Sequence, residues 1–540
     1  MTEWIILAAA ILVMLAVSSV RVARRYGAPA MLLFVALGLF VGEAGPVGYA
    51  FDDYALAYEL GLVALALIVF AGGFETEPSS LRAALVPSMS LATVGVIVKM
   101  AVVGGSLVAF AGMNLGEALL LGAIIAPTDA AAVFNVLKGQ GLRSRLAGML
   151  EAESGTNDPV SIYLTVAMTS LVVTGTMQAS DMVLGMVVQL GLGTVYGILA
   201  GHGLRALVNH MPPKDSPGLY PVLALAGGLG VYALSTKLGG NGFLAAYLAG
   251  HFMGRGRVHF RREVEHLLDS AAWFAQISLF LVLGLLASPE LVGDILPLAL
   301  GTTLAVLVAR PIAVIAAVAP LRLVGMRFER AEIALLSWGG LKGAVPIILA
   351  MVPLLAGHSG GERIFHVVFV VVLLATTLQG LTLIPLARRL DLLDPPKPVP
   401  PVSLELGGIA PPGSAIVDVA IDGAHPACGV RIADLDLPST VALAAIVRDG
   451  RIVAPRGPVV LSEGDHVFVL IPDETDADTV DAVSRLRGRT GPGRRLTTAQ
   501  PSDPDPAPSS SPSPSPGPAA EPESPAADDD LGDGAALVGP

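Results

Sequence analysis

Two short stretches of the sequence place acidic, hydroxyl and amide side chains inside long apolar runs. They read APTDAAAV (126–133) and SGTNDPV (154–160). The side chains in them that could bind an ion are Thr128, Asp129, Ser154, Asn157 and Asp158. A charged side chain at the centre of a bilayer costs roughly 3 kcal/mol on insertion scales, so such residues usually serve a function. Hard oxygen ligands of this kind suit an alkali cation that has lost its water.

A proline in each stretch adds a backbone carbonyl to the available ligands. Pro127 cannot donate a hydrogen bond, so the carbonyl of Ala123 loses its helical partner, and Pro159 frees the carbonyl of Gly155 in the same way. Irregular backbone at membrane depth is tolerated only where it lines a cavity or is buried in protein. The prolines therefore favour a cation site over an ordinary kinked helix.

The spacing of the second stretch brings its polar side chains together. Ser154, Asn157 and Asp158 stand at i, i+3 and i+4 and share one face of a helix. We predict that they bind the ion and the proton together with Thr128 and Asp129. Within this set, Asp158, Thr128 and Ser154 are expected to contact the transported cation.

Three further ionisable residues have ordinary structural explanations. Glu151 has the position of a helix N-cap. Lys99 could reach the membrane interface or form a structural pair, and Arg310 could be the counter-ion of a buried acid.

The composition places most of the chain in a membrane. Apolar residues make up 53% of the 540 residues, charged residues make up 14%, and the mean hydropathy is +0.69. The net charge of −12 does not indicate a binding partner, because residues 501–540 hold eight acidic residues and no Lys or Arg. The single cysteine, Cys428, excludes an internal disulfide.

Thirteen apolar runs are long enough to be considered as membrane spans. They are about 3–20, 28–43, 57–74, 84–112, 116–137, 150–175, 182–209, 217–236, 241–254, 270–288, 291–320, 331–356 and 364–387. With the N-terminus outside, eighteen basic residues fall in inward loops and only Lys237 and Arg363 face outward. The positive-inside rule thus predicts thirteen spans with a cytoplasmic C-terminus, and the first run is expected to be a retained span rather than a signal peptide.

The twelfth run, LLSWGGLKGAVPIIL (335–349), surrounds Lys342 with three glycines and a proline. Segments interrupted in this way, at corresponding places in two halves of a chain, indicate the crossed, broken helices of a secondary transporter. The fifth and twelfth runs are seven apart, as two inverted repeats of six helices separated by the seventh run require. We expect Asp129 and Lys342 to neutralise the dipoles of the half-helices there.

We expect a membrane domain at 1–390. The sequence after it predicts a linker (391–402), a small α/β domain (403–487) and a disordered tail (488–540). Short β-rich runs alternate in the α/β domain, RDGR (448–451) is typical of a hairpin turn, and a helix is expected at 475–487. The Pro-, Ser- and Asp-rich tail cannot bury enough surface to fold.

Four motifs together resemble the sodium- or potassium/proton antiporters of the first cation/proton antiporter family. They are FAGGFE (70–75), TDA (128–130), GTNDPV (155–160) and SWGGLKGAVP (337–346). The resemblance covers about residues 5–390. Residues 403–473 resemble the C-terminal half of the regulatory domain of potassium-conductance proteins, a pairing similar to the potassium/proton antiporter branch.

This resemblance implies a homodimer of thirteen-helix protomers, each with a rigid dimer part and a core that moves as an elevator. It implies that Asp158 is the ion-binding carboxylate, and that Glu153 and Arg310 form a supporting charge pair behind the site. It also implies a pairing of Glu75 with Lys342, where the family usually has arginine. Lysine keeps the charge but lacks the planar fork.

The expected function is exchange of a monovalent cation for a proton across the cell membrane, in cation, pH and volume homeostasis. Asn157 is neutral, so one carboxylate trades one proton for one cation and the exchange is expected to be electroneutral. K⁺ is favoured over Na⁺ because of the attached domain, which could bind a small-molecule regulator. No cofactor, no catalytic residue and no nucleic acid are expected.

Two other classes compete with this interpretation. A cation channel gated by the cytoplasmic domain would need a filter of backbone carbonyls resembling TVGYG, and no such motif stands in the sequence. A sensor or scaffold would use the buried charges for structure alone.

Overall fold

The computed structural model describes residues 2–393, apart from 27–28, 44, 77, 130–132, 134–141, 177, 211–217, 256–257 and 288–291. It also describes 415–471, apart from 424, 436, 438–440 and 449. The chain divides into two compact units, Met1–Val399 and Pro400–Pro540. The helix expected at 475–487, the tail and most of the linker lie outside the described residues.

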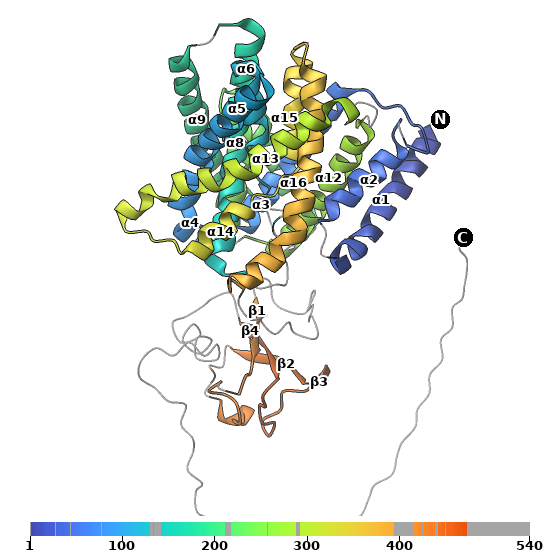
Figure 1. The fold of residues 1–540 in the computed structure, drawn as a ribbon. Coiled ribbons are helices and arrows are strands. Elements are labelled where there is room, and N and C mark those ends of the chain that lie inside the picture. Colours follow the sequence, from blue (N-terminus) through green and yellow to red (C-terminus); the bar gives the residue numbers. More distant parts are fainter. Residues whose placement is uncertain are drawn as a thin grey trace, which may run out of the picture. The chain divides into compact units, whose positions relative to one another are not determined.

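The first unit is helical (Figure 1). Its helices form two bundles that pack chiefly within themselves. The first bundle contains α1 (Thr2–Tyr26), α2 (Ala30–Val41), α3 (Tyr54–Glu75), α9 (Ala179–His210), α10 (Leu219–Lys237), α11 (Gly242–Gly254) and α12 (Arg261–Leu285). The second bundle contains α4 (Pro78–Ser90), the π-helical turn η1 (Leu91–Gly95), α5 (Val96–Ala111), α6 (Leu115–Ile125), α8 (Ser144–Thr174), α13 (Val292–Val318), the 3₁₀ turn η3 (Pro320–Val324), α14 (Arg330–Trp338), α15 (Ala344–Leu355) and α16 (Gly361–Arg389).

The membrane fold predicted from the composition is confirmed. Within the described residues, eight helices are long and apolar enough to cross a membrane, and three shorter apolar helices accompany them. The number of thirteen spans stays a prediction.

Glycines bring α3 and α11 of the first bundle into close contact. A Cβ atom at Gly73 would overlap the carbonyl of Tyr247, and one at Gly250 would overlap the carbonyl of Phe70. In lipid, small residues let helix backbones approach where no hydrophobic force draws helices together. The end of α3 is therefore held rigidly against α11.

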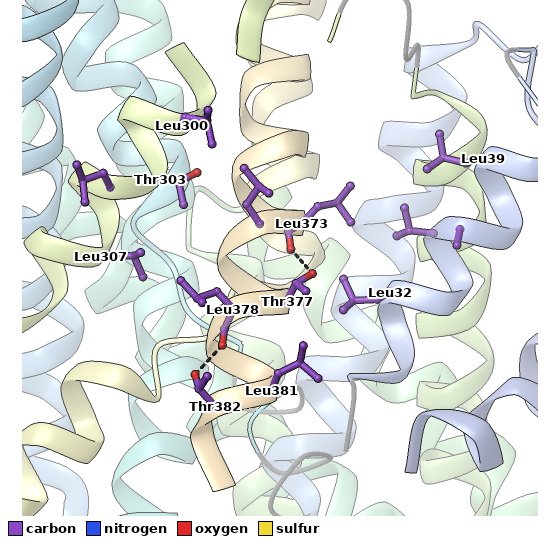
Figure 2. Close-up of a pocket in the computed structure, with 14 residues that line it drawn as sticks. Leu32, Leu39, Leu300, Thr303, Leu307, Leu373, Thr377, Leu378, Leu381 and Thr382 are labelled. Atoms are coloured by element: carbon purple, nitrogen blue, oxygen red, sulfur yellow. Dashed lines mark hydrogen bonds between the residues drawn. The ribbon is translucent and has the colours of Figure 1, made fainter. Parts of the chain in front are cut away.

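A groove of about 750 Å³ separates α2 of the first bundle from α13 and α16 of the second (Figure 2). Its lining is mostly leucine. The hydroxyls of Thr377 and Thr382 donate to the carbonyls of Leu373 and Leu378 in their own helix, both at 2.6 Å. The groove is apolar and is not the ion site.

The second unit contains a four-stranded antiparallel sheet in the order β1-β4-β2-β3. Its strands are β1 (Ala415–Ala420), β2 (Ala442–Arg448), β3 (Arg451–Val453) and β4 (His466–Ile471). Arg448 pairs with Arg451, so β2 and β3 form the predicted hairpin. The expectation of a small C-terminal domain with strands is confirmed.

The close contact of α3 and α11 predicts opposite effects of two neighbouring substitutions. Gly73→Ala inserts a methyl group where Tyr247 has its carbonyl and should lower the unfolding temperature in detergent. Gly72→Ala is the matched control, because nothing lies within 4 Å of its Cβ position and alanine favours a helix by about 0.5–1 kcal/mol. Equal unfolding temperatures for the two variants would contradict this account of the packing.

Candidate ion-binding site

Two helices of the second bundle, α6 and α14, end at non-helical segments that lie side by side. Residues 126–129 are non-helical after α6, and residues 339–343 are non-helical between α14 and α15. The N–H of Asp129 donates to the carbonyl of Leu341 at 2.9 Å. The breaks expected around Pro127 and the glycines beside Lys342 are thus present and are joined to each other.

Lys342 lies at the end of α6, where it was expected to balance the helix dipole. The carbonyls that end a helix lack intrahelical partners and carry partial negative charge. The Lys342 ammonium group donates to the carbonyls of Ile125 at 2.6 Å and Pro127 at 2.9 Å, and the carbonyl of Ala126 lies 3.4 Å away. Its side chain is only 2% exposed.

The expected pairing of Lys342 with Glu75 is wrong. Glu75, the last residue of α3, is exposed, and the described partners of the Lys342 ammonium group are the carbonyls beyond α6. An ammonium group directs three hydrogens at separate acceptors, whereas a guanidinium group presents a flat fork. Three carbonyls around one point therefore explain a lysine at this position.

Lys99 also lies at the candidate site, although the sequence had suggested only a structural role for it. Its ammonium group is buried and donates to the carbonyl of Ala126 at 2.5 Å, so it does not reach the membrane interface. The signal available in the sequence was a lysine in the middle of an apolar run of 29 residues, 84–112. Two cationic side chains, Lys99 and Lys342, thus bind the broken end of α6.

Asp129 lies at the start of α15, the helix that follows the second non-helical segment. A Cβ atom at Gly343 would overlap the Asp129 carboxylate, so this carboxylate sits against the backbone where α15 begins. The N-terminus of a helix carries partial positive charge. Only glycine at position 343 leaves room for the carboxylate there.

One face of α8 holds the first break in place. The hydroxyl of Ser154 donates to the carbonyl of Thr128 at 2.8 Å, and the amide of Asn157 donates to the hydroxyl of Thr128 at 2.7 Å. All three side chains are buried. The helix continues through Pro159, whose carbonyl accepts from the Asn241 amide at 3.2 Å.

Asp158 is buried beside this break, with 5% of its surface exposed. It interacts electrostatically with Asp129, Lys99 and Lys342. Its Oδ1 atom and the Oδ1 atom of Asn157 have no hydrogen-bonding partner within the described part of the chain. Buried polar atoms are normally satisfied, so these two oxygens are available to a ligand. An oxygen set of this kind fits an alkali cation.

Glu153 and Arg310 form the ion pair that the resemblance implied. Both side chains are buried, with exposures of 0% and 3%. The guanidinium contacts both carboxylate oxygens, with Nη2 at 2.9 Å from Oε2, and its Nε donates to the carbonyl of Leu336 at 3.1 Å. This arrangement fastens α8 to α13 and to the end of α14, directly behind the site.

Glu151 is not the N-cap that the sequence suggested. The helix α8 begins at Ser144, so Glu151 lies about two turns inside it. Its carboxyl group contacts the hydroxyl of Thr76, at the end of α3, at 2.6 Å. The helix starts earlier because Leu146, Met149 and Leu150 are buried, which adds an apolar turn before the acidic one.

Helices that end side by side within a bundle of membrane helices, with charged side chains at their ends, are typical of a secondary transporter. Residues 9–389 match the family model described as sodium/hydrogen exchanger, transmembrane, and residues 416–481 match the TrkA-C domain. The chain belongs to the sodium/hydrogen exchanger family and carries a TrkA-C domain, as the resemblance indicated.

Relatives share most of this architecture. The protein named K(+)/H(+) antiporter NhaP2 from Shewanella sp. (strain MR-4) is 39% identical over 472 residues, covering 86% of this chain and 80% of the relative. K(+)/H(+) antiporter NhaP from Alkalimonas amylolytica is 34% identical over 483 residues, covering 88% and 83%. The sodium proton antiporter MjNhaP1 from Methanocaldococcus jannaschii has a similar fold, with a TM-score of 0.59, 21% identity and coverage of 70% of this chain and 99% of that chain.

The buried ion pair predicts a large loss of stability when either partner is removed. Arg310→Ala or Glu153→Ala leaves an uncompensated charge, and we expect each to cost about 3–5 kcal/mol of unfolding free energy. The double variant should lose less than the sum of the two. The control is Arg145→Ala, because Arg145 is 44% exposed and lies 3.6 Å from Glu332; it should cost at most about 1 kcal/mol. Denaturation in detergent measures all four, and strictly additive losses would show that the two residues do not act as a pair.

Proposed function

We propose that this protein exchanges a monovalent cation for a proton across the cell membrane, and that Asp158 binds the two in turn. The observation that carries the proposal is the buried Asp158 carboxyl, with one oxygen unpartnered among the described residues, beside two crossed helix breaks. A proton and a metal ion both neutralise one carboxylate, so binding of one displaces the other.

The oxygens around Asp158 supply the cation ligands. Asp158, Thr128 and Ser154 contact the cation in this proposal, and Asp129 and Asn157 complete the site. Support comes from the two hydrogen bonds that hold Thr128 against α8, because ligands on a fixed backbone need little reorganisation when the ion binds. Lys342, Glu153 and Arg310 balance the charges around the ligands, and Glu75 has no place in this arrangement.

Charge balance supports exchange of one proton for one cation. The described ionisable groups at the site are three basic side chains, Lys99, Arg310 and Lys342, and three acidic side chains, Asp129, Glu153 and Asp158. With Asp158 protonated, or with Asp158 ionised and a monovalent cation bound, the site carries the same formal charge. The two loaded forms then cross the membrane field at equal electrical cost, and the exchange is electroneutral.

The division into two bundles supports an elevator mechanism. Every site residue proposed here belongs to the second bundle or its interruptions, so this bundle can carry the ion past a static first bundle. The static bundle is also where a homodimer would form without hindering the movement. We place the N-terminus outside and the C-terminus in the cytoplasm, on the distribution of basic residues.

K⁺ is the proposed cation, with Na⁺ as the alternative. The relatives from Shewanella and Alkalimonas are both named K(+)/H(+) antiporters and cover more than 80% of the chain. The TrkA-C domain is proposed to bind a small-molecule regulator, which shifts transport through its different affinities for the transport states. A channel gated by this domain is the competing function.

Neutralising Asp158 should abolish exchange. In vesicles with an imposed proton gradient, added K⁺ or Na⁺ should release protons through the wild type and not through Asp158→Asn. Asp181→Asn is the matched control, because Asp181 is exposed in the first turn of α9, and it should transport normally. Cation current without proton movement would identify a channel instead, and undiminished exchange by Asp158→Asn would refute the assignment.

Adding a carboxylate beside Asp158 should change the charge that is moved. Asn157→Asp allows two protons to exchange for one cation, so transport should become dependent on membrane potential. Asn157→Ala is the control, because it removes the same hydrogen bond to Thr128 without adding a charge. Valinomycin-clamped vesicles measure the dependence, and an Asn157→Asp variant insensitive to potential would contradict the one-for-one argument.

A further inference from the structure

Three buried hydroxyl groups continue the face of α8 that carries Asp158. Ser161, Thr165 and Thr169 follow Asp158 at intervals of three, four and four residues, and α8 is helical throughout. Residues at these spacings lie one above the other on a helix. Their exposures are 0%, 0% and 4%, and the ion-binding site described above does not use them. They form a row, called here the hydroxyl row, that extends about 16 Å along the helix from Asp158.

The hydroxyl row lacks the hydrogen bonds that other hydroxyls of the same helix make. Ser161 Oγ, Thr165 Oγ1 and Thr169 Oγ1 have no hydrogen-bonding partner within the described part of the chain. A serine or threonine inside a helix can donate to the carbonyl four residues earlier. Thr156 and Thr174 of α8 do so, at 2.6 Å and 2.7 Å. Buried polar atoms are rarely left unsatisfied, so the row points to a ligand.

The spacing of the hydroxyl row fits water molecules. Residues four apart are separated by about 6 Å along a helix axis. A water molecule that hydrogen-bonds to two oxygens spans about 5.5 Å, so one water can bridge each pair of neighbouring hydroxyls. A buried water makes about two to four hydrogen bonds, and two hydroxyls supply the first two. A metal ion needs a ring of oxygens in place of its hydration shell, which one hydroxyl per helical turn does not provide.

The hydroxyl row begins at the proposed proton-binding carboxyl group and stops at an apolar side chain. At its inner end, the Oδ1 atoms of Asn157 and Asp158 also lack partners among the described residues. At its outer end, the next residue on the same face is Val172, three residues after Thr169. The Val172 side chain lies against the first turn of α6, only 3.2 Å from where a Cβ atom on Gly116 would be. In the orientation proposed above, this end of α8 faces outside.

We propose that the hydroxyl row holds a file of water molecules that passes protons between Asp158 and the outer side of the membrane, while the cation takes another route. The proposal rests on the exchange function proposed above. Each hydroxyl and each water can accept one hydrogen and donate another. A proton that enters at Thr169 therefore releases a different proton to the Asp158 carboxylate, and no other bond is gained or lost. Val172 interrupts the file, so protons pass only when this side chain moves, which prevents a permanent leak.

Removing the central hydroxyl should slow proton movement and spare cation movement. Thr165→Val nearly keeps the shape of the side chain but interrupts the file, so exchange of cation for proton should fall about two- to tenfold, the range for one hydrogen bond. Exchange of a labelled for an unlabelled cation, with the same pH on both sides, involves no proton transfer and should keep the wild-type rate. Thr165→Ser retains the hydroxyl and should restore the exchange of cation for proton.

Both rates are measured in the same vesicles, with Thr302→Val on α13 as the matched control. The Thr302 hydroxyl is also buried but donates to the carbonyl of Leu298 in its own helix at 2.7 Å, so both rates of this variant should equal the wild type. If Thr165→Val lowers the two rates together, the row carries the cation or has only a structural role, and the inference is wrong. Two unchanged rates, or a Thr165→Ser variant that behaves like Thr165→Val, would also overturn it. A wild type that moves no protons would refute the proposed function itself, which is a distinct outcome.

Discussion

The structure depends on one constraint: two helices end inside a membrane domain, and the backbone groups at their ends must find partners there. Each unsatisfied backbone group in an apolar medium costs several kcal/mol, and no lipid atom can satisfy it. Lys342 and Lys99 take up the carbonyls beyond α6, and the backbone of Asp129 bonds to Leu341 across the two breaks. The basic side chains of the candidate site are therefore needed, first of all, to satisfy the backbone groups at the ends of the broken helices.

The helix α8 connects the helix ends to the other residues of the candidate binding site. Through Ser154 and Asn157 it fixes Thr128, and through Glu153 it is fastened to Arg310 on α13. All of these side chains belong to one helix, so α8 joins the break to the supporting ion pair. Asp158 belongs to the same helix and is buried beside the break.

Part of the site could be predicted because it depends on spacing along one helix. The positions i, i+3 and i+4 of Ser154, Asn157 and Asp158 define a face wherever the helix begins, and Pro127 marks the break without reference to other segments. The membrane fold followed from composition, and the hairpin at Arg448–Arg451 from its turn residues. Local rules were sufficient for these features.

Other parts depend on contacts between distant segments and could not be read in the same way. The pairing of Lys342 with Glu75 failed because three orphan carbonyls, which no side-chain pattern reveals, took up the ammonium group. Lys99 was left with a structural role because its acceptor, the carbonyl of Ala126, exists only where α6 is broken beside α5. Glu151 was taken for an N-cap because its partner Thr76 lies on another helix, 75 residues earlier in the chain.

The two acidic residues of α8 illustrate why burial alone does not assign a role. Glu153 is completely buried and paired with Arg310 through both carboxylate oxygens, so its charge already has a partner. Asp158 is almost as buried but keeps an oxygen without a partner among the described residues, so its charge is open to a ligand. A transported ion must be released as well as bound, and a carboxylate already committed to a guanidinium partner cannot do both. On this helix, the proposed exchange therefore assigns the ion to the acidic side chain that has an oxygen without a partner among the described residues.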